Sequence, residues 1–191
     1  MKGKLSLPLI LGLVLVLGGL GLGLFFGLRT YLGPQKGQRI AAQLEMLLPE
    51  RTVGVPTETD TPMPVLEIDG VDYVALLEIP SYGVKLPVSD EWDGKNLYAA
   101  PSRFSGSVYD NSLIIGGNDL KQFSFCDEIE NGEQVIITDL TGAQFSYTVV
   151  AVDRAKHAEA QWLSEEGTDL TLFCADTYSM GYIAVRCVQS Y

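Results

Sequence analysis

The stretch Asp169-Leu-Thr-Leu-Phe-Cys174-Ala175 is followed, after a short loop, by Tyr182-Ile-Ala-Val-Arg186-Cys187. Both segments are rich in β-branched, aromatic and aliphatic residues, which is typical of strands. The pattern predicts two antiparallel strands joined by a short loop. Because successive side chains of a strand point to opposite faces, Leu170, Leu172 and Cys174 are expected together on one face.

Similar short strands are expected throughout the preceding hundred residues. They are separated by turn sequences such as Glu130-Asn-Gly-Glu133 and Leu140-Thr-Gly142. The expected strands are residues 73–79, 84–88, 112–115, 134–138 and 145–152, and short helices are expected within 119–129 and 158–164. Seven short strands without a long helical pattern favour a closed barrel or a sandwich. We therefore expect an all-β domain with minor helices over residues 65–191.

The N-terminal region has a different character. Residues 5–28 carry no charge, and about 20 apolar residues are enough to cross a bilayer. No small-residue cleavage site follows Leu28, which favours an uncleaved signal anchor with the C-terminal domain outside the cell membrane. Within this span, Gly19, Gly23 and Gly27 recur every fourth residue. That spacing allows close helix–helix contact in a dimer, although glycine is also common in membrane helices without such a role.

A connecting region separates the anchor from the domain. Residues 38–48 have apolar positions at helical spacing and predict a short amphipathic helix that ends at Pro49. Residues 51–64 contain three prolines among Thr, Glu and Asp, which indicates an extended linker. The expected parts are an anchor (1–30), a juxtamembrane helix and linker (31–64) and the β domain (65–191).

Composition excludes several classes of partner and cofactor. The formal net charge is −11, and every acidic residue lies at or beyond Glu45. This charge argues against nucleic-acid binding and against electrostatic docking onto an anionic membrane. There are three cysteines and one histidine, without a Cys-x-x-Cys motif. An odd number of cysteines leaves at least one free thiol, and neither a metal site nor a cofactor is expected.

Four segments in order resemble the sortase family, specifically the class B-like sortases of Gram-positive bacteria. They are Ala75-Leu-Leu-Glu-Ile-Pro-Ser-Tyr-Gly-Val-Lys-Leu-Pro-Val88, Leu113-Ile-Ile-Gly-Gly-Asn118-Asp119 with Phe123, Leu170-Thr-Leu-Phe-Cys174, and Val185-Arg186-Cys187. Together they cover residues 68–188, nearly the whole exported domain. The resemblance implies a sortase-like closed β-barrel behind an N-terminal transmembrane helix.

The resemblance also implies a cysteine transpeptidase chemistry that this chain has altered. In the family, a cysteine attacks a sorting-signal peptide, a histidine serves as acid and base, and an arginine stabilises the oxyanion or holds the substrate. When the segments are matched, Asn118 stands at the histidine position, Ala175 at the cysteine position and Tyr182 at the arginine position. Cys174 stands one residue earlier, at the place of a threonine.

Alternative catalytic residues remain open at this point. Cys174 would face the substrate only if a bulge reversed the alternation of its strand; otherwise it is a buried core cysteine. His157 and Arg186 are possible stand-ins for the missing histidine and arginine. The simpler interpretation makes His157 a surface residue and Arg186 a strand-end residue.

Three functions follow from these observations. The first is a membrane-anchored extracellular pseudoenzyme that binds or scaffolds surface-protein or pilin peptides without transferring them. The alternative is an active cysteine transpeptidase that uses Cys174 to cleave sorting signals and anchor surface proteins. The third is a structural extracellular domain without a peptide site.

Overall fold

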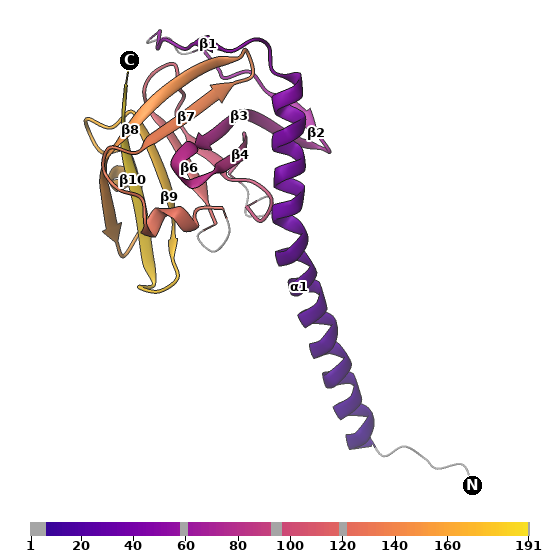
Figure 1. The fold of residues 1–191 in the computed structure, drawn as a ribbon. Helices are drawn as coiled ribbons and strands as arrows, with labels where there is room; N and C mark the ends of the chain where they lie inside the picture. The colour runs from indigo at the N-terminus through magenta and orange to yellow at the C-terminus, as the bar shows by residue number, and fades with distance from the viewer. Residues whose placement is uncertain (1–6, 58–60, 93–96, 119–121, 191) are drawn as a thin grey trace.

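The computed structural model describes residues 7–57, 61–92, 97–118 and 122–190. A long helix, α1, projects from a β-barrel (Figure 1). In chain order the elements are α1 (Leu7–Leu47), β1 (Thr52–Val53), β2 (Leu66–Ile68), β3 (Val71–Ile79), the 3₁₀ helix η1 (Pro80–Tyr82), β4 (Val84–Ser89), β5 (Ser102–Ser105), β6 (Leu113–Gly117), the 3₁₀ helix η2 (Ser124–Asp127), β7 (Gln134–Asp139), β8 (Ala143–Ala155), α2 (Ala160–Leu163), β9 (Leu170–Asp176) and β10 (Gly181–Gln189).

Eight of the strands close into a barrel. Around the ring, β3 pairs with β4, then follow β5, β6, β9, β10, β8 and β7, and β7 pairs again with β3. Most neighbours are antiparallel, while β4 with β5 and β6 with β9 run parallel. The expected closed β-barrel is therefore confirmed, and the sandwich alternative is excluded. Closure also leaves the ring without open strand edges.

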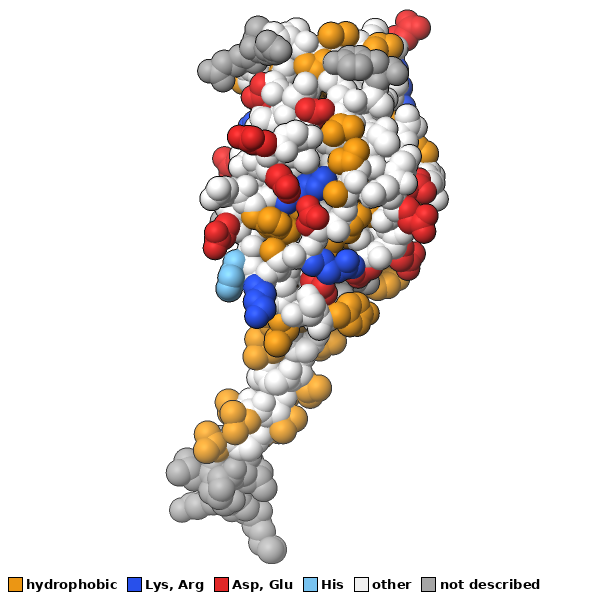
Figure 2. Space-filling model, turned by 90° about the vertical axis from the view of Figure 1, so that its left-hand side faces the viewer, with side chains coloured by type: hydrophobic (Ala, Val, Ile, Leu, Met, Phe, Trp, Pro, Cys, Tyr) orange, Lys and Arg blue, Asp and Glu red, His pale blue; other side chains and the backbone are white. Residues whose placement is uncertain are grey.

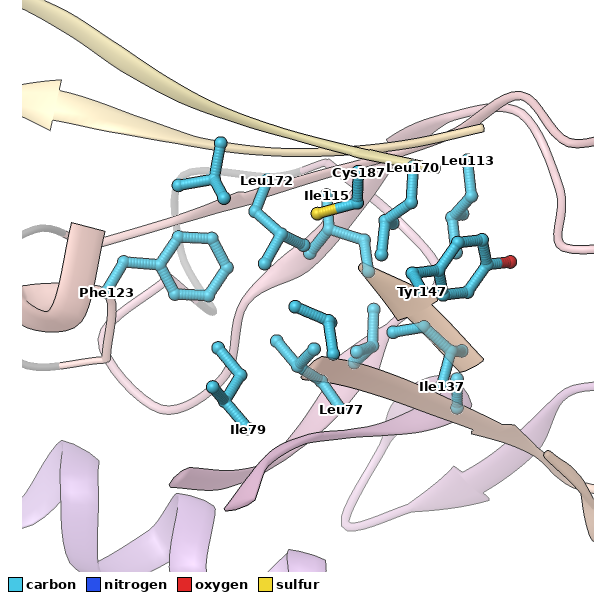
Figure 3. Close-up of a cluster of buried hydrophobic side chains, with 14 of the residues drawn as sticks. Leu77, Ile79, Leu113, Ile115, Phe123, Ile137, Tyr147, Leu170, Leu172 and Cys187 are labelled. Carbon is cyan, nitrogen blue, oxygen red and sulfur yellow. The ribbon is translucent and has the colours of Figure 1, made fainter. Parts of the chain in front are cut away.

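The barrel interior is filled by the alternate apolar side chains of its strands (Figure 3). Leu77 and Ile79 of β3 meet Leu170 and Leu172 of β9 across this core, and Phe123 covers one end. Burial of such large apolar side chains is the main stabilising contribution to the fold. Every second side chain of a barrel strand thus points into the core, and the side chains between them point to the outer surface.

The seven expected strands are all present, mostly longer than expected; the short strands β1 and β2 outside the ring were not expected, and of the eight barrel strands β5 was missed. Its sequence, Ser-Arg-Phe-Ser, is too short and polar to show a strand pattern. In the barrel, the Ser102 hydroxyl lies 2.7 Å from that of Ser89 on β4, so two buried hydroxyls satisfy each other. The two short helices η2 and α2 lie inside the two segments where helices were expected.

Helix α1 runs without interruption through the expected boundary at residue 30. Within the part of the chain that the structure describes, it is the one helix long and apolar enough to cross a membrane, and its apolar portion is not covered by the barrel. The apolar segment expected as an anchor and the expected juxtamembrane helix therefore form one continuous helix, whereas the sequence suggested separate parts. The sequence suggested a boundary because the composition changes near residue 30. A change in composition does not require a change in backbone conformation, and the helix continues through it.

The C-terminal part of α1 packs closely on the barrel. A Cβ atom at Gly33 would lie 2.4 Å from the carbonyl oxygen of Tyr98, and one at Gly37 would lie 2.1 Å from that of Ala99. Farther along, Ile40 and Leu44 are completely buried. The helix therefore lies directly against the barrel, and glycine at positions 33 and 37 allows the backbones to come so near.

The segment after α1 is extended, as expected, but it is not a free linker. Gly54 lies against the ring of Phe145, and the side chain of Met63 is buried in the barrel core. The backbone amide of Thr57 also donates a hydrogen bond of 3.0 Å to the carbonyl oxygen of Tyr109. The segment therefore wraps along the barrel surface and contributes to its stability.

Candidate functional site

The three positions that the resemblance matched to catalytic residues lie in one row across β6, β9 and β10. Ala175 pairs directly with Tyr182 in the β9–β10 ladder. Gly117, the last residue of β6, pairs with Cys174, so Asn118 continues this register beside Ala175. Neighbouring strands are about 4.8 Å apart, so the row spans about 10 Å. We call Asn118, Ala175 and Tyr182 the outer row.

The outer row points away from the core. A side chain at Gly116 would meet Trp92 and Phe173 outside the barrel, whereas one at Gly117 would meet the core residue Phe123. Asn118 therefore falls on the outer face by alternation. Ala175 is exposed, and Tyr182 is half-buried. The structure thus assembles these positions on one accessible surface, but as an amide, a methyl group and a phenol.

Cys174 lies on the opposite face. Its side chain is 1% exposed and belongs to the barrel core together with Leu170 and Leu172. The β9–β10 register runs without a shift from Gly181 to Cys187, so no bulge in this ladder turns the sulfur outward. Burial and the neighbouring Cys174 raise the pKa of the Cys126 thiol well above its ordinary value. Two cysteine side chains therefore meet inside the barrel, away from the outer row.

Asn118 closes a backbone turn after β6. Its carbonyl oxygen accepts hydrogen bonds from the amides of Gln122 and Phe123, at 3.1 and 2.9 Å. The side-chain amide of an asparagine neither accepts nor releases a proton near neutral pH. Asn118, which the motif resemblance matches to the histidine position, therefore supplies no acid or base there. Asp119, the next residue, lies outside the described residues.

Of the two possible stand-ins, His157 is exposed after the end of β8. Ala155 pairs with Tyr182, so His157 stands two residues beyond the strand position that faces the outer row. Figure 2 shows it, in pale blue, at the lower edge of the barrel.

Arg186, the second stand-in, is buried and fully engaged. Its guanidinium donates to the carbonyl oxygens of Trp162 and Leu163, to Thr171 at 3.2 Å, and to Asp153 at 3.1 Å. It also lies 5.0 Å from the centre of the Trp162 ring, a cation–π contact. With 1% exposure, this side chain fastens α2 to the barrel and is not directed at the outer row.

Sequence reasoning missed a group of charged residues at the mouth of the barrel. Arg154 forms an ion pair with Asp127 of η2 at 3.2 Å and lies 3.9 Å from Asp176 at the end of β9. A cleft of about 360 Å³ opens here beside Ala175, lined by Ser124, Asp127, Glu128 and residues 175–178. These residues come from separate parts of the chain, and their sequence contains no signal that they converge.

Aromatic side chains cover the outer face next to the row. The rings of Trp92, Phe104 and Phe173 pack together with centroid distances of 5.2 to 5.6 Å. Trp92 lies over Gly116, where a Cβ atom would be 2.0 Å from the indole ring. We call these three residues the aromatic cluster. It occupies the surface of β6 and β9 that leads toward Asn118 and Ala175.

A search of the described residues finds no group of three or more His, Cys, Asp or Glu side chains that could hold a metal ion. The outer row offers the hydrogen-bonding groups of Asn118 and Tyr182 and the methyl group of Ala175. Beside it, the carboxylates of Asp127 and Asp176 lie next to Arg154. All three cysteines are buried, so none of their thiols faces the outer row.

No family model matches the chain, and no curated protein matches it. Solved structures do match. Sortase A from Corynebacterium diphtheriae superposes with a TM-score of 0.55 at 18% identity, covering 63% of this chain and 62% of that one. Sortase C1 from Streptococcus agalactiae gives 0.57 at 22% identity, covering 65% and 71%. A Clostridium perfringens sortase C, solved with the C-terminal cell wall sorting motif, gives 0.55 at 19%, covering 63% and 71%.

These comparisons establish that the chain has the sortase fold, as the sequence motifs indicated. The chain spans less than two thirds of the corynebacterial sortase A. The three structures are described as sortases A, C and C1, so the expected likeness to class B stays a prediction. Fold likeness at this identity does not assign an activity.

Proposed function

We propose that this protein is a membrane-anchored extracellular sortase-fold protein that has lost transpeptidation and binds or scaffolds peptides of surface or pilin proteins. One observation carries the proposal: Ala175, which the motifs match to the nucleophile position, is exposed in the outer row, while the Cys174 side chain is buried in the core. An acyl-enzyme requires a thiolate that reaches a substrate carbonyl carbon. A side chain that is 1% exposed does not reach one.

The other two outer-row residues support the same proposal. Asn118 supplies no acid or base, and Tyr182 supplies a neutral hydrogen bond in place of a fixed positive charge. Arg186 does not compensate for the missing charge, because its guanidinium is engaged beneath α2. Cleavage would require a change at all three positions together, whereas peptide binding requires only the cleft and its surroundings.

Anchoring is supported by α1, whose apolar part lies outside the barrel. A membrane location would hold the barrel beside other proteins of the cell surface. The solved sortase C with its sorting motif supports a peptide as the class of ligand. The peptide sequence itself stays open.

The decisive experiment measures turnover of a panel of fluorogenic sorting peptides with an amine acceptor. We expect no turnover by the full-length wild type and none by Cys174→Ala. A solved sortase assayed with its own substrate is the positive control for the panel. Turnover by wild type that Cys174→Ala abolishes would establish Cys174 as the nucleophile and support the active-transpeptidase alternative.

Binding is measured with the same peptides by fluorescence anisotropy. We expect saturable binding that Ala175→Arg weakens at least severalfold, because an arginine there would fill the cleft beside β9. Val53→Arg is the matched control, since Val53 is also exposed but lies on β1, away from this cleft. Absence of binding by every peptide would favour the structural-domain alternative.

A further inference from the structure

Two large apolar side chains stand fully in solvent at the turn between β9 and β10. Tyr178 is 91% exposed and Met180 is 90% exposed, among the most exposed large apolar side chains of the barrel. They belong to residues 177–180, which we call the β9–β10 turn. Single exposed apolar residues are common, but two at the tip of one tight turn form a small apolar point.

The turn is held in shape by its own hydrogen bonds. Asp176 accepts bonds of 3.0 Å from the backbone amides of Tyr178 and Ser179, and a further bond from the Ser179 hydroxyl. These bonds, the Ser179 hydroxyl first, lower the pKa of the Asp176 carboxyl, so it stays ionised at neutral pH. Met180 has a φ of 53°, which side-chain-bearing residues rarely adopt. The fold thus keeps a strained methionine pointing outward.

The β9–β10 turn lies at the end of the barrel from which the apolar part of α1 extends. Figure 1 shows the turn at the lower end of the barrel, on the same side as the projecting half of the helix. Contact between α1 and the barrel begins at Gly33, five residues after the last residue of the uncharged span, Leu28. At 1.5 Å per helical residue, that interval is about 7.5 Å. The barrel is therefore held close to the membrane surface that the helix crosses.

We propose that the β9–β10 turn inserts Tyr178 and Met180 into the interface of the bilayer that α1 spans. The bilayer is the occupant favoured by this geometry, because the close contact at Gly33 and Gly37 holds the turn toward it. Tyrosine is suited to such a position, since its ring enters the apolar boundary while its hydroxyl stays hydrated. The inference rests on the proposed anchoring by α1 and does not depend on the proposed loss of transpeptidation.

The contact is apolar and not electrostatic. The barrel is strongly acidic, and acidic side chains are spread over the face shown in Figure 2. Hydrophobic side chains appear at its lower end near the tail, together with Lys and Arg side chains. Next to the turn, Arg154 is already paired with Asp127, and Glu128 adds a negative charge. The insertion should therefore occur in zwitterionic lipid and persist at high salt, which screens charges beyond about 3 Å at 1 M.

Insertion would position the candidate site relative to the membrane. Ala175 lies two residues before the start of the turn, and Tyr182 lies two residues after its end. The cleft beside Ala175 also includes Thr177 and Tyr178. A peptide in that cleft would then lie at the lipid surface, so the ligand class narrows to membrane-proximal segments of other proteins.

The test uses the full-length chain in zwitterionic liposomes with an environment-sensitive fluorophore on a single introduced cysteine. The three native cysteines are buried, so the unmodified chain gives the labelling background. Tyr178→Cys and, separately, Met180→Cys report on the turn. Val53→Cys is the matched control, since this side chain is 85% exposed on β1, near the top of Figure 1. Leu20→Cys reports on α1.

With spin-labelled lipids, we expect loss of fluorescence at positions 20, 178 and 180 and none at position 53. Iodide in the aqueous phase should quench position 53 and spare position 178, at both low and high salt. Quenching by lipid at position 20 but not at 178 or 180 would overturn the inference and leave the anchoring intact. Absence of lipid quenching at position 20 would instead refute the anchoring proposal and remove the basis of this inference.

Discussion

At the residue scale, the adjacent residues Cys174 and Ala175 carry the functional argument. Because they are neighbours on β9, their side chains point to opposite faces. Cys174 points into the core, and Ala175 lies in the outer row. A sortase-like strand thus retains a cysteine without presenting it. Arg186 is a similar case: it lies in the expected strand, but its guanidinium binds the carbonyl oxygens of α2 and is not available to a ligand.

The first residue-scale prediction concerns thiol reactivity. In the folded protein, Cys174 should not react with a charged methanethiosulfonate reagent, since its side chain is 1% exposed. Ala175→Cys should react rapidly, because the new thiol lies on the outer face. Mass spectrometry before and after denaturation measures both, and denatured wild type should take up three labels. Modification of folded wild type at Cys174 would contradict the core placement.

The second residue-scale prediction concerns Arg186. Arg186→Met should lower the free energy of unfolding by about 2–4 kcal/mol, because the carbonyl oxygens of Trp162 and Leu163 lose a charged donor and Asp153 loses its partner. Urea denaturation measures the change. Arg154→Met is the matched control: its pair with Asp127 is half exposed and it lies 3.9 Å from Asp176, so we expect a change below about 1 kcal/mol. Equal effects of both substitutions would show that Arg186 is not a fastening residue.

At the scale of the element, α1 is both the proposed anchor and a wall of the folded domain. Its first half is apolar on all sides and outside the barrel, whereas Ile40 and Leu44 in its second half are buried. Ion pairs complete the attachment, with Lys85 of β4 reaching Glu45 at 2.6 Å and Glu78 at 3.1 Å. The glycine pattern at residues 19, 23 and 27 faces open space in the single chain, so dimerisation stays a prediction.

The element-scale prediction separates the two halves of α1. Gly37→Ala should destabilise the folded domain by about 1–3 kcal/mol, because the new methyl group would overlap the carbonyl oxygen of Ala99. Gly21→Ala is the matched control, since a Cβ atom there meets nothing within 4 Å. Thermal unfolding in detergent reports both, and a Gly37→Ala protein as stable as Gly21→Ala would refute the close contact.

At the scale of the whole molecule, the barrel is oriented relative to its proposed membrane. The β9–β10 turn lies toward the end of the barrel from which α1 projects (Figure 1), and Ala175 and Tyr182 of the outer row flank this turn. A continuous helix transmits this orientation, whereas a flexible linker would lose it. The proposed peptide site would therefore face the proposed membrane.

The whole-molecule prediction is that the anchor is not removed. Intact-mass analysis of protein extracted from membranes should give the full-length chain, because no cleavage motif follows Leu28 and the residues around position 30 are helical. A mature N-terminus near Thr30 would contradict this prediction. Protease treatment of intact cells should degrade the barrel and spare α1, as expected for a domain on the outer side.

The sequence by itself predicted seven of the eight barrel strands and the long apolar helix, because hydrophobic periodicity and turn residues are local signals. The strand pattern left a barrel and a sandwich open, and the resemblance of the ordered motifs to sortases favoured the barrel. It also predicted the three members of the outer row, since ordered motifs preserve strand register. The short polar strand β5 gave no local signal, and neither did the continuity of α1 across residue 30.

Only the tertiary structure decided which groups meet. The direction of the Cys174 sulfur depends on an unbroken ladder with β10, and the engagement of Arg186 depends on α2, 23 residues away in sequence. The aromatic cluster joins Trp92, Phe104 and Phe173, and the mouth of the barrel joins Asp127, Arg154 and Asp176. These contacts arise from closure of the barrel, which brings distant strands together, and no local pattern encodes them.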